Sequence, residues 1–434
     1  MADGVKIVYE SAKSGKTYEF LGRDVKSVNV INEIDPISSS LPANTLDAVV
    51  MSKDGFADDV QFEDSVSLYV NDKISFVGTV KDFDFVQGND IKISCFDKIR
   101  KLENFALATG ILLDNDNVYD FFSKIGEDIG QEIEMSDDVK SKTLTGYLPK
   151  GTNYNDLIMQ ICFSVGLVAS ISETGNIKIF SIDSNSAPSQ TIPSERLLQN
   201  YKLERKKEEY SVTISELVVG IGARKWAGNI QFNGAGTKRL YFDVPYTNYV
   251  LVDENGASYH STLSIVDSGP FYVDVSCWFS GTAYAFVYGY PYEFSYQTIT
   301  KSPGEESSAR FVKNVSVSEN VGFVTDENSD EVAERIYNHY NNRADFEIRI
   351  VDGVHKVKAD SDYAKYGEKH YGSFLYGSTE EKWDYIYDQP TSVGDVVVLE
   401  TKEYGNLRGV ITKQTFGIYS GRKIVKNSIV SVEV

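Results

Sequence analysis

Cysteine, histidine and long apolar runs are scarce in this chain of 434 residues, and each scarcity argues against a class of protein. The three cysteines, Cys95, Cys162 and Cys277, lie far apart, form no CxxC pair and have apolar neighbours. We therefore predict buried, reduced thiols rather than a disulfide framework. No run of about 18 apolar residues occurs and no signal peptide opens the sequence, so we expect no membrane span and assembly in a cytoplasm.

Signatures of catalysis and of metal binding are also lacking. The four histidines, His260, His339, His355 and His370, fit no HExxH spacing, and no GxSxG nucleophile elbow is present. Carboxylates are so numerous that only their separation in the fold could identify a catalytic pair. We expect no enzyme, no cofactor and no metal site.

Two short motifs imitate ligand-binding loops. Gly15-Lys16-Thr17 follows an expected strand, but Glu10 stands where a phosphate-binding loop needs its first glycine, and no helix follows. Residues 114–117, DNDN, lack the glycine and the distal glutamate of a calcium loop. We predict a hairpin turn for the first motif and a helix cap before Val118 for the second.

Acidic residues outnumber basic residues by 63 to 43, which gives a formal net charge of -20. Nucleic-acid affinity comes largely from lysine and arginine, so this balance argues against a nucleic-acid-binding module. The charge serves solubility, or it provides an acidic surface along which a polyanion slides without sticking. The acidic pairs Asp58-Asp59 and Asp137-Asp138 are interpreted as solvated turns.

What the chain has in abundance is aromatic residues in short alternating segments. Its 28 tyrosines and 23 phenylalanines favour β-sheets, and its length suggests about three or four domains at about 150 residues each. The predicted fold class is mainly β with α+β: two small β-barrels flank an α+β domain and a β-rich domain. The first barrel is expected over residues 1–105, where apolar residues alternate with period two in 46–50, 66–70 and 91–95.

The most specific local pattern runs from Thr143 to Phe180. Apolar residues at helical spacing predict an amphipathic helix over residues 154–165. Thr152 or Asn153 is positioned to cap its first turn, and Gly166 is positioned to end it.

The same α+β domain, expected over residues 106–200, holds a predicted hairpin and a second helix. Residues 167–171 and 177–179 read as strands around a turn at 173–176. Apolar residues at helical spacing predict the other helix from 118 to 129. The domain is therefore expected to lay helices on a small sheet.

A β-rich domain is expected over residues 201–325. Asn255-Gly256 is its clearest hairpin signal. An aromatic belt between Tyr241 and Tyr296 could stack on sugar rings, but aromatic residues are also enriched in sheets, and we favour packing. The belt includes Trp278, Tyr284, Tyr288, Tyr290, Tyr292 and Tyr296.

The last domain, residues 326–434, is expected to be a helix capped by Ser329 and followed by a second barrel. Residues 361–390 interrupt its strands and repeat Tyr-Gly. We predict an extended loop that presents aromatic anchors to a partner, with packing on its own domain as the open alternative. The candidate contact residues are Tyr366, Tyr371, Tyr376 and Trp383.

The order of these segments resembles the baseplate hub proteins of long-tailed phages, contractile ones above all, and of phage-tail-like particles of Gram-positive bacteria. The middle of the likeness is TGYLPKGTNYNDLIMQICFSVGLVASISETGNIKIF. The first barrel of that family is similar to ISSSLPANTLDAVVMSKDG and the strands after it, its late helix to DEVAERIYNHYNNRADFEIRIV, and its terminal strands to VGDVVVLETKEYGNLRGVITKQTFGIYSGRK. The likeness covers most of residues 30–434.

This resemblance implies a structural role in a virion tail baseplate. Each chain would supply two related, tube-like β-barrels, and a homotrimer would close a pseudo-sixfold ring with a channel for DNA. The ring would join a hexameric tail tube to a trimeric spike or tip. The implied partners are the tail tube protein or tube initiator, the central spike or tip protein, baseplate wedge proteins and the tape measure protein, with no sequence-specific nucleic acid.

The insert at 361–390 departs from the family pattern. Fused relatives carry wall-degrading or fibre domains beyond the last barrel, so we expect those activities in other chains. Two alternative classes stay open. One is a carbohydrate-binding tail adhesin, which the aromatic belt supports; the other is a cell-wall hydrolase component, which would need a clustered carboxylate pair or metal site.

Overall fold

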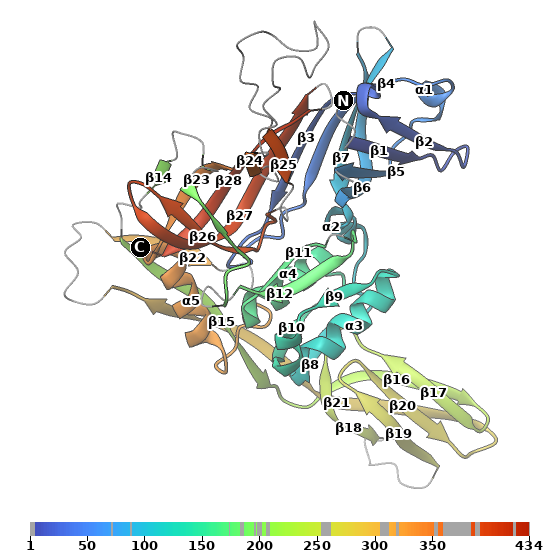
Figure 1. Cartoon of the computed structure of the whole chain (residues 1–434). Coiled ribbons are helices and arrows are strands. Elements are labelled where there is room, and N and C mark those ends of the chain that lie inside the picture. The colour runs from blue at the N-terminus through green and yellow to red at the C-terminus, as the bar shows by residue number, and fades with distance from the viewer. Residues whose placement is uncertain are drawn as a thin grey trace, which may run out of the picture.

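The computed structural model describes the chain except for residues 1–4, 71–72, 87–88, 173, 183–185, 195–196, 198–201, 205–208, 253–261, 304–311, 318–320, 351–354, 359–382, 387–390, 420–421 and 434. Figure 1 labels its strands and helices in chain order. The described part is mainly β, and its long helices α3, α4 and α5 have 12 or 13 residues each. The mainly β fold class is confirmed.

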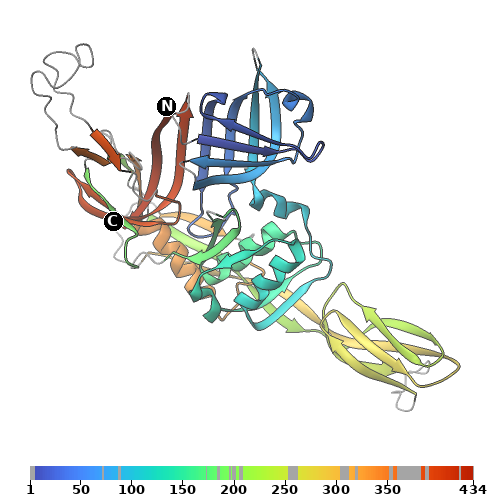
Figure 2. The ribbon, with the colours of Figure 1, turned by 45° about the vertical axis from the view of Figure 1, so that its right-hand side comes forward.

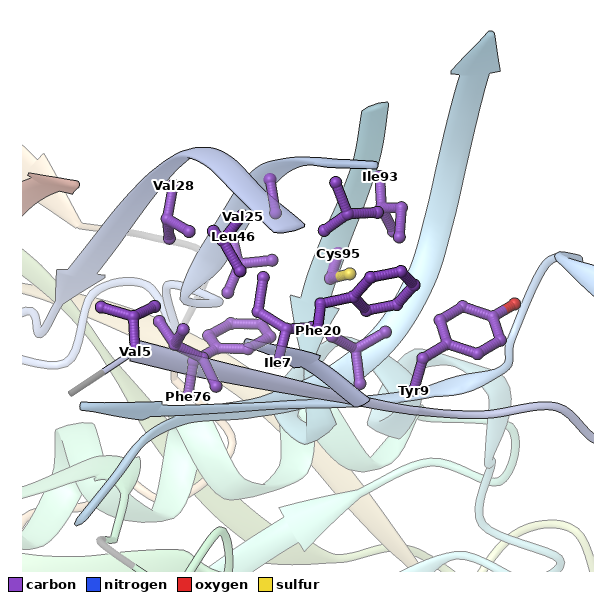
Figure 3. Packing of buried hydrophobic residues seen from close by; sticks show 14 of the residues in the cluster. Val5, Ile7, Tyr9, Phe20, Val25, Val28, Leu46, Phe76, Ile93 and Cys95 are labelled. Atoms are coloured by element: carbon purple, nitrogen blue, oxygen red, sulfur yellow. The ribbon is translucent and has the colours of Figure 1, made fainter. Parts of the chain in front are cut away.

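The first seven strands form a curled sheet with one apolar face. They are β1 Val5–Glu10, β2 Thr17–Leu21, β3 Val25–Glu33, β4 Thr45–Met51, β5 Ser65–Val70, β6 Lys73–Phe85 and β7 Asp90–Asp97, with short helical turns at η1 Gly22–Asp24 and α1 Phe56–Asp59. Because side chains alternate across a strand, every second residue points into one core. Figure 3 shows Ile7, Leu46 and Ile93 meeting there, all fully buried.

The glycine-lysine-threonine motif lies in the turn between β1 and β2. Gly15 has φ of 67°, and its N–H donates to the Ser11 carbonyl at 2.9 Å. A strand follows, so the hairpin prediction is confirmed. The solvated-turn interpretation is wrong for Asp59, which is 8% exposed and accepts a hydrogen bond from the Tyr18 hydroxyl at 2.5 Å.

The next part of the chain lays two helices against short strands. Its elements are α2 Lys98–Lys101, η2 Leu102–Asn104, β8 Ile111–Asn117, α3 Val118–Ile129, β9 Ile133–Met135, η3 Asp137–Ser141, β10 Thr143–Leu148, α4 Tyr154–Val165, β11 Leu167–Ile171 and β12 Ile177–Ser181. Asn153 caps α4 by accepting a hydrogen bond from the Asp156 N–H at 2.8 Å, and Gly166 ends it in the left-handed region. Asn117 caps α3 in the same way. Both helices and the hairpin of β11 and β12 are confirmed.

A two-layer arm projects from the rest of the molecule (Figures 1 and 2). Its strands are β16 Lys225–Asn233, β17 Gly236–Tyr241, β18 Tyr246–Val252, β19 Leu263–Gly269, β20 Tyr272–Cys277 and the first part of β21 Thr282–Lys301. The rest of β21 pairs with β15 Glu209–Ile221, which pairs with β22 Val312–Val317 in the body of the molecule. The sheets β16-β21-β18 and β17-β20-β19 enclose one apolar core. Long strands β15 and β21 pair antiparallel and connect the arm to the body.

The remaining elements belong mostly to the end of the chain. They are β13 Gln190–Ile192, β14 Lys202–Glu204, α5 Ser329–Asn341, β23 Arg343–Ile350, β24 His355–Lys358, β25 Trp383–Ile386, β26 Val396–Thr401, β27 Gly405–Tyr419 and β28 Arg422–Glu433. The prediction that Ser329 caps α5 is wrong. Asn328 holds the cap position, and its side-chain oxygen accepts instead from the Thr325 N–H at 2.9 Å, so Ser329 is already helical.

The strands of the two predicted barrels share one 13-stranded sheet. Its main path runs β14-β23-β28-β27-β3-β4-β7-β6-β5-β1-β2; β26 branches from β27, and β13 pairs with β26. Within the described residues the path does not return on itself, so the prediction of two closed barrels is wrong. The reason is that the C-terminal half of β27 pairs with β3, from Lys413 opposite Glu33 to Tyr419 opposite Ser27. Two local hairpin patterns thus merge through a long-range pairing.

Candidate functional site

No catalytic constellation is present in the described part of the chain. No three His, Cys, Asp or Glu side chains gather there as metal ligands, and no described helix is long and apolar enough to cross a membrane. The three cysteines are buried and free, as predicted. Among the histidines, His339 packs edge-on against Tyr340, whereas His260 and His370 lie outside the described residues and the His355 side chain is likewise not described. The candidates for function are therefore surfaces.

One open pocket of about 390 Å³ lies between α3, α4 and residues 105–109. Its wall is largely apolar, with Lys124 and Asp128 as its charged groups, and the Tyr154 hydroxyl donates to Asp128 at 3.3 Å. A lone carboxylate beside a tyrosine offers no nucleophile with its base. The pocket provides no basis for catalysis.

The first candidate surface is the polar face of the shared sheet, opposite the apolar cores. We call it the tube face and define it by Asn29, Ile31, Glu33, Thr45, Asp47, Lys92, Ser94, Lys413 and Thr415. Strand register places these side chains on the same side, because residues directly opposite in neighbouring strands share a face. The tube face therefore extends without interruption from β7 to β27.

The tube face carries charges of both signs and satisfies part of its polarity internally. Lys413 pairs with Glu33 across β27 and β3 at 2.7 Å, and Ser94 donates to the Asp47 carboxylate at 2.5 Å. Lys92 lies opposite Asp84 of β6. The side chains of the tube face are mostly polar, so water can cover the surface. Its positive and negative charges are mixed, so it has no strong local affinity for phosphate.

A buried carboxylate fixes one end of the same sheet. Asp97 is 1% exposed and accepts hydrogen bonds from the backbone N–H groups of Asn44 at 2.8 Å and Ile99 at 3.0 Å. Desolvation raises the pKa of Asp97 to about 7, against the lowering effect of these donors. The carboxyl group therefore joins β7, the segment before β4 and the start of α2.

The aromatic belt of the arm divides between the core and the surface. Tyr246 and Tyr249 pack with Phe242, which confirms the packing prediction for them. The prediction is wrong for Trp278, Tyr284 and Tyr296, which are 72%, 38% and 60% exposed. On β21 the alternate residues Ala283, Ala285 and Val287 fill the core instead.

The predicted partner contacts cannot be placed as a group. Tyr366, Tyr371 and Tyr376 lie outside the described residues, as does the Asn255-Gly256 hairpin signal. The backbone of Trp383 begins β25, which pairs with β24, but its side chain is not described.

Three solved structures share the fold of this chain. The tail protein from Neisseria meningitidis MC58 aligns with a TM-score of 0.53 and 10% identity, covering 99% of this chain and 96% of its own. The 43 kDa tail protein of prophage MuSo2 from Shewanella oneidensis aligns with a TM-score of 0.52 and 9% identity, covering 98% of both chains. The prophage tail protein gp18 from Listeria monocytogenes EGD-e aligns with a TM-score of 0.50 and 11% identity, covering 98% of this chain and 94% of its own.

No protein-family model and no curated protein matches the sequence. Identities near one residue in ten speak for the fold and not for shared details of a site. Nearly the whole chain, arm included, is covered in each comparison. The chain therefore has the fold of these phage tail proteins.

Proposed function

We propose that this protein is a structural component of a phage tail or phage-tail-like particle and acts as its baseplate hub, without enzymatic activity. The observation that carries the proposal is the shared sheet, in which β3 and β27 join the first and last parts of the chain into one surface. The fold likeness to three tail proteins over at least 98% of the chain supports it.

The proposed assembly is a homotrimer in a pseudo-sixfold ring. Each protomer contributes its two tube-like units, 1–105 and 326–434, while 106–200 and 201–325 form the outer domains. The tube face lines a channel for DNA, and the ring joins a hexameric tube to a trimeric spike. Partners at the ring are the tube protein or tube initiator, the spike or tip protein, wedge proteins and the tape measure protein.

The open edge of the shared sheet suggests where protomers meet. Strand β2 ends the path of the sheet at Leu21, which is 52% exposed. Exposed strand edges invite pairing with another chain unless they are covered. In the proposed ring, the neighbouring protomer covers this edge.

Mass measurement with negative-stain imaging tests the proposal. The purified chain, alone or with its spike partner, should give three times the 48.5 kDa chain mass and a ring with a central hole. Leu21→Lys should weaken the trimer, whereas Val266→Lys, on an arm residue of similar exposure at 54%, should not. A persistent monomer in both preparations would contradict the hub function.

The channel is proposed to have no net affinity for DNA phosphates, because Glu33 and Asp47 balance Lys92 and Lys413 on the tube face and the chain as a whole has a net charge of -20. Coordinates of the assembled ring would contradict this if its channel proved basic. A cell-wall hydrolase component has no support from the described carboxylates, and measurable peptidoglycan hydrolysis by the pure chain would reverse that view.

A further inference from the structure

We propose that the outer face of the arm binds neutral oligosaccharides through a row of aromatic rings and side-chain amides. The arm face, as we call it, consists of Trp226, Asn229, Gln231, Tyr284, Phe286, Tyr288 and Tyr290. This site is separate from the tube face and does not rest on the hub function. It gives the arm a ligand class of its own.

Strand register brings these residues onto one surface. In β21, Tyr284, Phe286, Tyr288 and Tyr290 alternate with core residues, so all four point away from the arm core. Trp226 of β16 lies opposite Tyr288, and Gln231 lies opposite Tyr284. Asn229 lies opposite Phe286. The rings therefore follow the strand at two-residue spacing, with amides along one side.

Two of the five rings are exposed, Phe286, Tyr288 and Tyr290 are half-buried, and Arg224 lies against the ring of Tyr288. Trp226 is 56% exposed, and Tyr284 is 38% exposed. The hydroxyl groups of Tyr284, Tyr288 and Tyr290 make no hydrogen bond to any residue that the structure describes, and neither does the amide of Asn229. The exposed ring surface of Trp226 and Tyr284 adds little to stability, and it leaves flat aromatic faces free to contact a ligand.

The chemistry of the arm face selects an uncharged ligand. The chain has 63 acidic residues, yet none lies on the described part of this face, and Arg224 lies 5.7 Å from the ring of Tyr288. Aromatic faces are electron-rich and attract the weakly positive C–H groups on the flat side of a sugar ring. Free hydroxyl and amide groups can then pair with sugar hydroxyls.

The opposite outer face of the arm provides a contrast. There Arg239 makes a bidentate pair with Asp274, with both N–O distances at 2.7 Å, and the Tyr272 hydroxyl donates to Asp267 at 3.0 Å. The polar groups of that sheet satisfy one another, as expected of a solvent-facing surface. On the arm face the Gln231 amide donates to Asn233 at 3.2 Å, whereas the Asn229 amide and the three tyrosine hydroxyl groups make no hydrogen bond to a described residue.

The arm stands apart from the shared sheet in both views of the molecule (Figures 1 and 2). Its face is consequently remote from the surface on which protomers are proposed to meet. A saccharide polymer on a cell surface could reach it without displacing a neighbouring protomer. The location favours a saccharide over a second copy of this chain as the occupant.

Tryptophan fluorescence provides a direct test, because the chain has only three tryptophans. In the full chain carrying Trp278→Phe and Trp383→Phe, Trp226 is the single reporter. We expect saturable changes in its emission with the β-1,4-linked hexamer of N-acetylglucosamine or of glucose as probe. Absence of saturable binding of both probes would overturn the proposal.

Matched variants assign the binding to the arm face. In calorimetric titrations with the same probes, Trp226→Ala and Tyr288→Ala should each weaken binding about tenfold or more, as removal of a stacked ring does. Trp278→Ala, at the most exposed described tryptophan of the arm, should leave affinity within about twofold of the unchanged chain. An equal loss with Trp278→Ala would place the site elsewhere and overturn the proposal.

The mass of each variant separates this proposal from the hub function. Trp226→Ala should keep the oligomeric state of the unchanged chain while losing saccharide binding. If Trp226→Ala alters the oligomeric mass instead, the arm face is a contact between copies and the saccharide proposal is wrong. Failure of the chain to form a ring, with saccharide binding intact, would contradict only the hub function.

Discussion

Single side chains show which contacts are encoded locally in this sequence and which depend on distant residues. The caps of α3 and α4 could be predicted to within a few residues, as one of 114–117 and as Thr152 or Asn153, because a helix start is encoded locally; the structure selects Asn117 and Asn153. Asp59 was misread as solvated, since its partner Tyr18 lies 41 residues away and the sequence does not show that the two meet. Cap residues act locally, whereas a buried carboxylate is defined by distant neighbours.

Asp97 should make the first sheet less stable as pH rises from about 4 to about 7. Its pKa is raised to about 7 in the folded chain, against about 3.9 when unfolded, so the folded state holds a proton that the unfolded state has released. The free energy of unfolding then falls by up to about 1.4 kcal/mol per pH unit in this window. Hydrogen exchange of the β4 and β7 amides at pH 5, 6 and 7, corrected for intrinsic rates, measures it.

Asp97→Asn provides the comparison for this prediction. The amide does not titrate, so the variant should lose the part of the pH dependence that Asp97 contributes. Asp54→Asn, which removes an exposed carboxylate, should retain the full slope. An unchanged slope in Asp97→Asn would show that the carboxyl group is ionised throughout this pH range.

At the scale of elements, helix α4 and its hairpin were predictable because their signals are contiguous. Strand β21 was predictable as a strand, but the direction of its faces was not. The alternation of small and aromatic residues in β21 fits a strand with either set facing the core. The volume available between the two sheets of the arm decides which set is buried. Leu240 approaches so closely that a Cβ on Gly228 would lie 2.9 Å from it, so this tight sandwich admits Ala283, Ala285 and Val287 rather than rings.

The C-terminus of α4 should be more sensitive to substitution than that of α3. Gly166 and Gly130 both end their helices with positive φ, 72° and 64°. Alanine at either site should cost about 1 kcal/mol through left-handed backbone strain. At Gly166 the new Cβ would also lie 3.0 Å from Nη1 of Arg335, while at Gly130 nothing lies within 4 Å.

Thermal unfolding of Gly166→Ala and Gly130→Ala checks this difference. We expect Gly166→Ala to be the less stable by at least about 1 kcal/mol, because the guanidinium group of Arg335, whose Nε and Nη1 atoms are buried, must move. A double-mutant cycle with Arg335→Met should return a coupling of about 0.5 kcal/mol or more. Equal losses with no coupling would mean that Arg335 relaxes freely.

For the whole molecule, the decisive feature was the one that the sequence could not predict. The hairpin patterns gave two groups of strands, and each looked sufficient for a barrel of its own. Pairing between β3 and β27 depends on a register across hundreds of residues, for which a sequence has no local signal. The strand patterns of the separate domains therefore do not reveal the sheet that unites the chain.

An engineered disulfide should verify this pairing. Ile31 and Thr415 lie directly opposite each other in β3 and β27, where Cα atoms are about 4.5 to 5.5 Å apart and a disulfide can close. Ile31→Cys with Thr415→Cys should therefore cross-link on mild oxidation, detected by non-reducing electrophoresis and peptide mapping. The native cysteines are buried and should not interfere.

A pair on the same face but farther apart serves as the control. Lys92→Cys with Thr415→Cys joins β7 to β27 across two intervening strands and is offset by four residues along them, a separation of about 20 Å. This pair should not cross-link within one molecule. If it does, or if the first pair fails under the same oxidation, the shared sheet is not formed in solution as described here.

The pairing of β3 with β27 also sets a waiting time during synthesis. Lys413 and Glu33, which pair across these strands, are 380 residues apart, so β3 emerges from the ribosome long before its partner. At about 5 to 20 residues per second, one edge of β3 stays uncovered for roughly 20 to 80 seconds. Such an edge can pair with a neighbouring nascent chain. Fragments that end before β27 should consequently aggregate. Premature pairing would begin between nascent chains on one polysome, where several ribosomes translate the same mRNA.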